Sequence, residues 1–185
     1  MQKATRVANV MLRASLRRLS AAKAPAKKVK VGDSVPEATV FAGNPPTPVD
    51  TAELLGGKTI VLLTVPGAFT GTCSKQVPML AAKSAEIKAK FNAETLYCVA
   101  TNDAFVMDAW AKSLGVEADQ MKMLSDPSQS LLKALGLSVN LPVLGGARYS
   151  RACCVIADGK IVHLWEEPDA KKMTCTLPEE MLKEA

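Results

Sequence analysis

The sequence predicts one α/β domain with a mixed β-sheet flanked by helices. Two patterns lead to this prediction. Apolar, strand-like runs alternate with helix-like stretches through most of the chain, and a β-hairpin pattern followed by a last helix ends it. With 185 residues, of which 48% are hydrophobic and 22% charged, the chain is long enough for one domain with an adequate core.

The positive charge of the chain is concentrated at its start. Residues 1–30 hold nine of the 23 Lys and Arg residues and no acid, which leaves the remainder with a net charge of −4. A mildly acidic body is not expected to bind nucleic acid. No apolar run approaches the roughly 20 residues of a membrane-spanning helix, so no membrane partner is expected.

The leader, residues 1–22, is acid-free, carries several arginines and contains Ser and Ala. This composition is typical of a mitochondrial transit peptide, with plastid delivery or a cytoplasmic protein with a basic tail as alternatives. Residues 23–30 consist mainly of Ala, Lys and Pro and are expected to form a linker without a fold of its own. The folded domain is therefore placed at residues 31–185.

The first half of this domain is predicted to contain extended segments, a short helix and a long helix. In chain order these are extended residues 33–42, a helix opened by a capping box at 50–53, a buried strand at 59–65 and a helix at 74–91. A turn at 43–46, which contains Gly, Asn and two prolines, separates the first two of them.

The second half is predicted to add two more strands, two helices and the terminal hairpin and helix. These are a strand at 94–101, a helix from Asn102 to 114, a strand at 121–124, a helix from Asp126 to 136, hairpin strands at 149–157 and 160–165, and a helix after Thr176. Asp158-Gly159 supplies the tight turn of the hairpin.

The segment 66–73, Pro-Gly-Ala-Phe-Thr-Gly-Thr-Cys, is the strongest indication of chemistry. It places Cys73 where a buried strand turns into a helix, close to free backbone N–H groups and the positive end of the helix dipole. Both favour the thiolate, which is the reactive form of cysteine. Pro66 is expected to stiffen the turn, and Thr70 can direct its hydroxyl at the sulfur.

The spacing Pro66-x-x-x-Thr70-x-x-Cys73 resembles the active-site loop of the peroxiredoxins, the thiol peroxidases. The longer string resembles the peroxiredoxin-5 subfamily, also called atypical two-cysteine or type II. Further similar segments follow in order at 99–105, 126–127, 157–160, 167–169 and 174–176. The sequence departs from the usual loop at Gly71 and Thr72, and the stretch before Pro78 is one residue shorter and lacks a frequent histidine.

This resemblance implies a thioredoxin-like fold and a peroxidase that reduces hydrogen peroxide and organic hydroperoxides, an antioxidant role in cell redox homeostasis. Cys73 would become a sulfenic acid, with the Thr70 hydroxyl, the Cys73 N–H and Arg151 stabilising the transition state. Arg151 is expected within the first hairpin strand. Cys175 would resolve the sulfenic acid as a disulfide, and thioredoxin would reduce it. Relatives form homodimers.

Two alternatives stay open at this point. One is a one-cysteine peroxidase recycled by glutaredoxin and glutathione, and the other is a peroxide sensor or redox relay. Cys98, inside an apolar strand, is interpreted as mainly structural, with a resolving role as the alternative. The consecutive Cys153 and Cys154 should point to opposite faces of a strand and pack in the core.

Other features narrow the classes of function. The chain lacks a Cys-x-x-Cys motif, which argues against a disulfide reductase of the thioredoxin type. Its single histidine, His163, lies in a predicted strand, so neither a zinc site nor a Cys–His hydrolase pair is expected. No metal or organic cofactor is implied. Arg148 is interpreted as a solvated residue or one at the substrate's edge.

Overall fold

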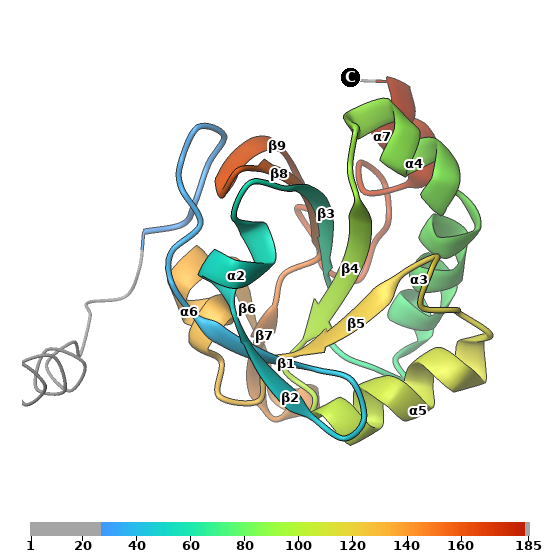
Figure 1. The fold of residues 1–185 in the computed structure, drawn as a ribbon. Helices are drawn as coiled ribbons and strands as arrows, with labels where there is room; N and C mark the ends of the chain where they lie inside the picture. The colour runs from blue at the N-terminus through green and yellow to red at the C-terminus, as the bar shows by residue number, and fades with distance from the viewer. Residues whose placement is uncertain (1–26, 184–185) are drawn as a thin grey trace, which may run out of the picture.

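The computed structural model describes residues 27–183 and contains a mixed sheet with helices on both of its faces (Figure 1). The strand order is β2-β1-β5-β4-β3-β8-β9. The central strands β3, β4 and β5 are parallel, whereas β1 and β8 are antiparallel to their neighbours in this core. The predicted α/β class with a mixed sheet is therefore confirmed.

The elements of the sheet and the helices have these bounds. The strands are β1 (Thr39–Ala42), β2 (Thr47–Asp50), β3 (Thr59–Thr64), β4 (Thr95–Ala100), β5 (Lys122–Ser125), β8 (Ala152–Ala157) and β9 (Lys160–Glu166). A second, two-stranded sheet consists of β6 (Ser138–Leu141) and β7 (Gly146–Tyr149). The helices are α2 (Thr51–Leu55), α3 (Gly71–Ala82), α4 (Ser84–Phe91), α5 (Ala104–Leu114), α6 (Ser130–Leu135), the short η1 (Pro142–Leu144) and α7 (Pro178–Lys183).

The sheet separates two hydrophobic cores, because successive strand residues point to opposite faces. Helices α3, α4, α5 and α7 cover one face, and α2 and α6 cover the other (Figure 1). Cys153 lies in the first core and its neighbour Cys154 in the second, as predicted. His163 lies in β9, where its ring stacks on Trp165 with centroids 5.3 Å apart.

The predicted helix at 74–91 is wrong in its bounds, because it consists of α3 and α4 with a break at Lys83. There the backbone leaves helical geometry, with φ −99° and ψ 10°. The first helix also begins earlier than predicted, at Gly71, with Thr70 as its N-cap residue. Cys73 therefore lies inside the first turn of α3 and not ahead of it.

The two predicted helix caps differ from expectation. Asp50 is the N-cap residue of α2, as predicted, but its carboxylate makes no capping hydrogen bond and accepts from the Thr39 hydroxyl at 2.6 Å. Helix α5 is capped by Asp103, which accepts from the Val106 N–H at 3.0 Å. Asn102, the residue expected to cap α5, has a different role at the active-site loop.

The predicted linker at residues 23–30 is wrong in its described part. Val29 is buried in the core under α6, and its N–H donates to the Leu135 carbonyl at 3.0 Å. Lys28 forms an ion pair with Glu166. The folded domain thus begins before residue 31, while the leader at 1–22 lies outside the described residues. Within residues 27–183, no helix is long and apolar enough to cross a membrane.

Arg151 does not lie within a hairpin strand as predicted. Strand β8 begins one residue later, at Ala152, and the preceding Tyr149 ends β7, where it pairs with Ser138 of β6. Residues 150 and 151 connect these two strands. The sequence pattern did not reveal this change of sheet because only two residues separate β7 from β8.

Candidate active site

The loop between β3 and α3 is held by strand β4 and by the loop that follows it. The Val65 N–H donates to the Val99 carbonyl at 3.1 Å, and the Ala68 N–H donates to the Asn102 side-chain oxygen at 2.9 Å. Pro66 is buried in this loop. Phe69 adopts a positive φ of 57°, which is uncommon for a residue with a side chain. The chain thus reverses sharply before α3 begins.

Cys73 is the third residue of α3, and its side chain is fully buried. The first N–H groups of a helix have no acceptor within the helix, and the dipole places partial positive charge there. This position, together with the strand that precedes the loop, matches the expected strand-to-helix junction. The start of the helix therefore places backbone N–H groups and partial positive charge near the sulfur.

Arg151 brings a full positive charge to this sulfur. Its Nη2 lies 3.4 Å from the Cys73 Sγ, and the arginine is only 1% exposed. Nε and Nη2 also donate to the Ala170 carbonyl at 3.1 and 2.9 Å, and Nη1 donates to the Gln76 side-chain oxygen. These contacts fix the plane of the guanidinium, so its orientation toward Cys73 is set by its neighbours.

Glu167 is the buried carboxylate of this region. Oε1 accepts from the Thr174 N–H at 2.6 Å, the Thr176 N–H at 2.9 Å and the Thr176 hydroxyl at 2.8 Å, while Oε2 accepts from the Thr174 hydroxyl at 2.6 Å. Burial disfavours the ionised carboxylate, but these hydrogen bonds outweigh it and lower the pKa of Glu167 to about 2. Glu167 is therefore an anion at neutral pH.

Thr70 differs from the expectation in the direction of its hydroxyl. Its Oγ1 donates to the Gly67 carbonyl at 3.0 Å and not to the Cys73 sulfur. A hydroxyl has one hydrogen to donate but can also accept. The Thr70 oxygen thus presents acceptor lone pairs, while its hydrogen supports the loop.

Cys175 lies between the two threonines that contact Glu167 and is partly exposed. Burial and the nearby Glu167 carboxylate raise the pKa of its thiol. The Gln76 side-chain amide donates to the Thr176 hydroxyl at 2.7 Å, which joins the Cys175 segment to α3. All five cysteines of the chain are free thiols in this structure.

Cys98 and Cys153 pack in the same core cluster as Cys73. They lie on strands β4 and β8, and each is paired in register with Leu63 of the strand between them. Burial raises the pKa of Cys98 far above its usual range, with a smaller contribution from Cys73. The surroundings of Cys98 therefore favour an inert thiol.

Sequence reasoning missed three residues that contact this site, Gln76, Glu167 and Asn102. Gln76 could have been noticed as a polar residue one helical turn from Cys73. Glu167 and Asn102 belong to segments that resemble the family, although neither side chain was assigned a role at the active site. Arg148, interpreted as solvated or peripheral, is half-buried and donates to Thr101 at 2.8 Å and to the Leu144 carbonyl.

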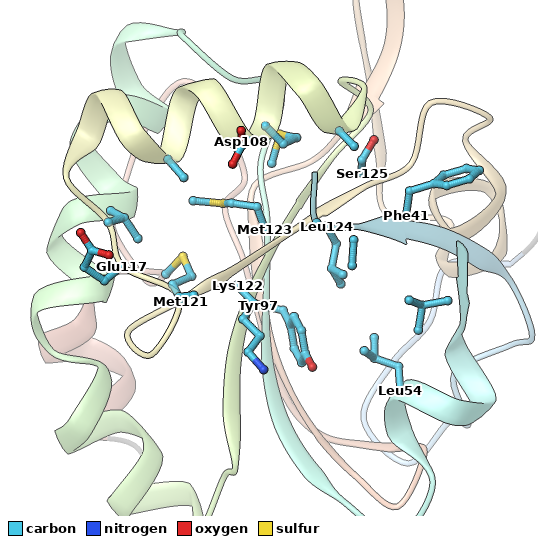
Figure 2. Close-up of a pocket in the computed structure, with 18 of the residues that line it drawn as sticks. Phe41, Leu54, Tyr97, Asp108, Glu117, Met121, Lys122, Met123, Leu124 and Ser125 are labelled. Atoms are coloured by element: carbon cyan, nitrogen blue, oxygen red, sulfur yellow. The ribbon is translucent and has the colours of Figure 1, made fainter. Parts of the chain in front are cut away.

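A separate pocket of about 560 Å³ lies between α5, β5 and α2. Figure 2 shows Tyr97, Met123 and Leu124 among the side chains that line it. It contains none of the predicted site residues. In the part of the chain that the structure describes, no group of three or more His, Cys, Asp and Glu side chains could hold a metal ion.

Comparison with known proteins identifies the family. A family model described as Redoxin matches residues 30–179. The chain is 39% identical over 163 residues to peroxiredoxin-2E-2, chloroplastic, of Oryza sativa subsp. japonica, covering 84% of this chain and 72% of the relative. The chain belongs to the peroxiredoxins. Peroxiredoxin-2C of the same plant is 38% identical over 159 residues, covering 84% of this chain and 97% of that protein.

Solved peroxiredoxin structures share the fold. Reduced Prx3 of Vibrio vulnificus in complex with H2O2 superposes with a TM-score of 0.78 at 33% identity, covering 84% of this chain and 94% of that one. Peroxiredoxin 5 of Alvinella pompejana gives a TM-score of 0.67 at 30% identity, covering 77% and 92%. This peroxiredoxin is thus a thioredoxin-like α/β protein, and its family membership makes it a thiol-dependent peroxidase.

Proposed function

We propose that this chain is a type II, peroxiredoxin-5-like enzyme that reduces hydrogen peroxide and alkyl hydroperoxides with Cys73 as the nucleophile. The observation that carries the proposal is the 3.4 Å contact between Arg151 Nη2 and the Cys73 sulfur, in the first turn of α3. A fixed cation next to a buried sulfur can stabilise negative charge that develops on the sulfur and on a bound peroxide in the transition state.

In the first step, the Cys73 thiolate attacks one oxygen of the peroxide. A sulfur–oxygen bond forms, the oxygen–oxygen bond breaks, and the second oxygen leaves as hydroxide or alkoxide, which takes up a proton. The sulfur is oxidised to a sulfenic acid. Arg151 and the Cys73 N–H stabilise the charge shared by the sulfur and both oxygens, and the Thr70 oxygen accepts the hydrogen of the peroxide.

In the second step, the Cys175 thiol attacks the sulfur of the Cys73 sulfenic acid. A disulfide forms and water leaves, and thioredoxin then reduces the disulfide by thiol exchange. The contact between Gln76 and Thr176 supports this pairing because it places the Cys175 segment against α3. Cys98 is the alternative partner, since it shares the Cys73 core cluster, but it is fully buried.

A one-cysteine cycle with glutathione and glutaredoxin is the second candidate. The observation that favours it is the raised pKa of Cys175, because a smaller thiolate fraction slows its attack on the sulfenic acid. An external thiol would then take the place of Cys175. Both cycles share the first step at Cys73.

For localisation, the relatives support a plastid destination in place of the mitochondrial one that the leader first suggested. Peroxiredoxin-2E of Arabidopsis thaliana, 37% identical over 163 residues, is named chloroplastic, as is the rice peroxiredoxin-2E-2. Both destinations use leaders rich in Arg and Ser and poor in acids. We therefore propose import into plastids. Fusion of residues 1–30 to a fluorescent protein should direct it there, and accumulation in mitochondria would overturn this assignment.

The test of the catalytic proposal follows hydrogen peroxide consumption with either thioredoxin or glutathione and glutaredoxin as the reductant. With thioredoxin, the wild type should turn over continuously, whereas Cys175→Ser should complete one turnover and stop. Peptide mapping under non-reducing conditions should show a Cys73–Cys175 disulfide after peroxide treatment. Normal cycling of Cys175→Ser with thioredoxin would rule out the two-cysteine cycle, and a Cys73–Cys98 disulfide would assign resolution to Cys98.

A further inference from the structure

The pocket between α5, β5 and α2 forms where two strands of the sheet diverge. Strand β1 pairs Phe41 with Ser125 and Ala42 with Leu124 of β5, and it then leaves β5 at Gly43, where a turn begins. The pocket occupies the space that opens between them, and α2 completes its wall. Its volume of about 560 Å³ is within the range of about 300–1,000 Å³ that is usual for small-molecule sites.

The turn at 43–46 is fixed against α5 by side-chain contacts. Asn44 Nδ2 donates to Asp108 Oδ2 at 2.8 Å, and Lys112 Nζ forms an ion pair with the same oxygen at 2.8 Å. Asp108 and Lys112 therefore offset each other's charge on this side of the pocket. Because these contacts already exist in the free protein, the pocket is pre-formed.

The side of the pocket next to α5 is rich in methionine. Met107 and Met121 are buried, Met123 is half-buried, and all three line the pocket. Figure 2 shows Met121 and Met123 close to α5, with Glu117 at the outer end of this side. Thioether side chains are flexible and polarizable, so they adapt to the shape of an apolar ligand. This side is therefore suited to an aliphatic chain.

The opposite side of the pocket carries cations. Lys122 pairs in register with Tyr97, and Figure 2 shows both side chains extending away from α5. Lys58 lines the same pocket, and both lysines are exposed, so their stems can follow the wall while the ammonium groups stay at the mouth. Glu53 of α2 offsets one of these two charges. This side therefore keeps a net positive charge and the Tyr97 hydroxyl as a donor.

We propose that this pocket binds a free long-chain carboxylate, with its aliphatic chain against the three methionines and its carboxylate at Lys58 and Lys122. Burial of methylene groups supplies most of the affinity, and the two ammonium groups select the sign of the headgroup. Cys73, Thr70 and Arg151 lie outside the pocket, so the inference is independent of the function proposed above.

The first test measures affinity by isothermal titration calorimetry of the full chain with dodecanoate. Each methylene added between octanoate and dodecanoate should strengthen binding about fourfold, as expected for burial of one methylene group. Dodecyltrimethylammonium should bind at least about tenfold more weakly than dodecanoate. Equal affinity for the two headgroups would overturn the proposal, as would the absence of saturation below about 1 mM dodecanoate.

The second test locates the ligand through the methyl groups of the methionines. In a protein labelled with ¹³C at these methyls, dodecanoate should shift the NMR signals of Met107, Met121 and Met123. Met79 on α3 and Met181 on α7 lie outside the pocket and should not shift. Shifts of similar size at Met79, which is exposed, would indicate non-specific adsorption and would overturn the assignment of the site.

Two pairs of variants test the two sides of the pocket. Ala111→Trp fills the space next to α5 and should weaken dodecanoate binding at least about tenfold, whereas Ala109→Trp, on the exposed side of the same helix, should stay within about twofold of the wild type. Thermal unfolding shows whether each variant is folded. Wild-type affinity in a folded Ala111→Trp protein would overturn the site.

The headgroup is tested at the surface, where substitutions leave the core intact. Lys58→Gln/Lys122→Gln should weaken dodecanoate binding about fivefold to tenfold, as expected for the loss of two exposed ionic contacts. Lys90→Gln/Lys160→Gln removes the same charge at exposed positions outside the pocket and should leave the affinity unchanged. Equal affinities of the two double variants would overturn the role of Lys58 and Lys122. Binding to anionic phospholipid vesicles without binding of dodecanoate would also overturn the proposal.

Discussion

The first turn of α3 and the middle of β4 each hold a fully buried cysteine in the same core cluster, yet their surroundings differ. Cys98 lies in a paired strand, and burial raises its pKa. Cys73 lies at a helix start with a guanidinium nitrogen 3.4 Å from its sulfur. Burial alone therefore does not distinguish the proposed nucleophile from the cysteine interpreted as structural, whereas the charged partner at Cys73 does.

The largest expected effect comes from removing each thiol in turn. Cys73→Ser should abolish peroxide consumption, because a serine hydroxyl is scarcely ionised at neutral pH and cannot form a sulfenic acid. Cys98→Ala, a similar truncation in the same core, should keep the rate of the first reaction with peroxide. Stopped-flow measurement on both variants checks this, and appreciable activity in Cys73→Ser would contradict the assignment of the nucleophile.

The charged partner itself is tested by Arg151→Lys. An ammonium group cannot reproduce the contacts that Arg151 makes with Ala170, Gln76 and Cys73. Loss of one transition-state contact of this kind costs about 2.7–4 kcal/mol, or about 10²–10³ in rate. Arg148→Lys is the matched control, because that arginine holds Thr101 and Leu144 instead. Equal rates of peroxide consumption in Arg151→Lys and Arg148→Lys would contradict the role proposed for Arg151.

The comparison of the two buried thiols becomes sharper in an alkylation experiment. If burial alone decided reactivity, iodoacetamide would label Cys73 and Cys98 at equal rates in the native, reduced protein. We expect Cys73 to react at least about tenfold faster, because the thiolate is the reacting form and positive charge favours it. Time-resolved peptide mass spectrometry measures both rates in one sample. Equal labelling would contradict this explanation.

The smallest predicted effect concerns stability in acid. The pKa of Glu167 falls from 4.5 to about 2 on folding, so the carboxylate binds a proton less readily in the folded state. Its stabilising contribution is complete above pH 4.5 and is lost as the pH falls through about 2. The free energies of unfolding of the wild type and Glu167→Gln, measured with denaturant, should therefore converge as the pH falls through this range. A difference between them that does not change with pH would show that the charge of Glu167 does not contribute to stability.

Much of the fold follows from the sequence because periodicity and turn residues act locally. The buried strand before Pro66, the hairpin turn at Asp158-Gly159 and the opposite faces of Cys153 and Cys154 could all be predicted in this way. The break at Lys83 could not, because Lys and Ala favour a helix on both sides of it. The start of α3 was also misplaced, since Gly71 and Thr72 are weak helix formers.

The site was predictable in its residue types but not in its connections. The motif indicated Cys73 and Thr70, the family resemblance indicated Arg151, and the fold brings Arg151 to Cys73 from a distant part of the chain. The hydrogen bonds from Glu167 through Gln76 depend on tertiary contacts between segments about 100 residues apart, which no local pattern encodes. The direction of the Thr70 hydroxyl likewise depends on the conformation of the loop.

Complete burial of Cys73 makes access to it a matter of kinetics. Its loop neighbours Phe69 and Gly71 are exposed, so the sulfur is buried although the loop that precedes it lies at the protein surface. A compact peroxide needs a smaller displacement of the surrounding side chains to reach a buried sulfur than a bulky oxidant does. We therefore expect this burial to favour small peroxides over the large disulfides of other proteins as oxidants of Cys73.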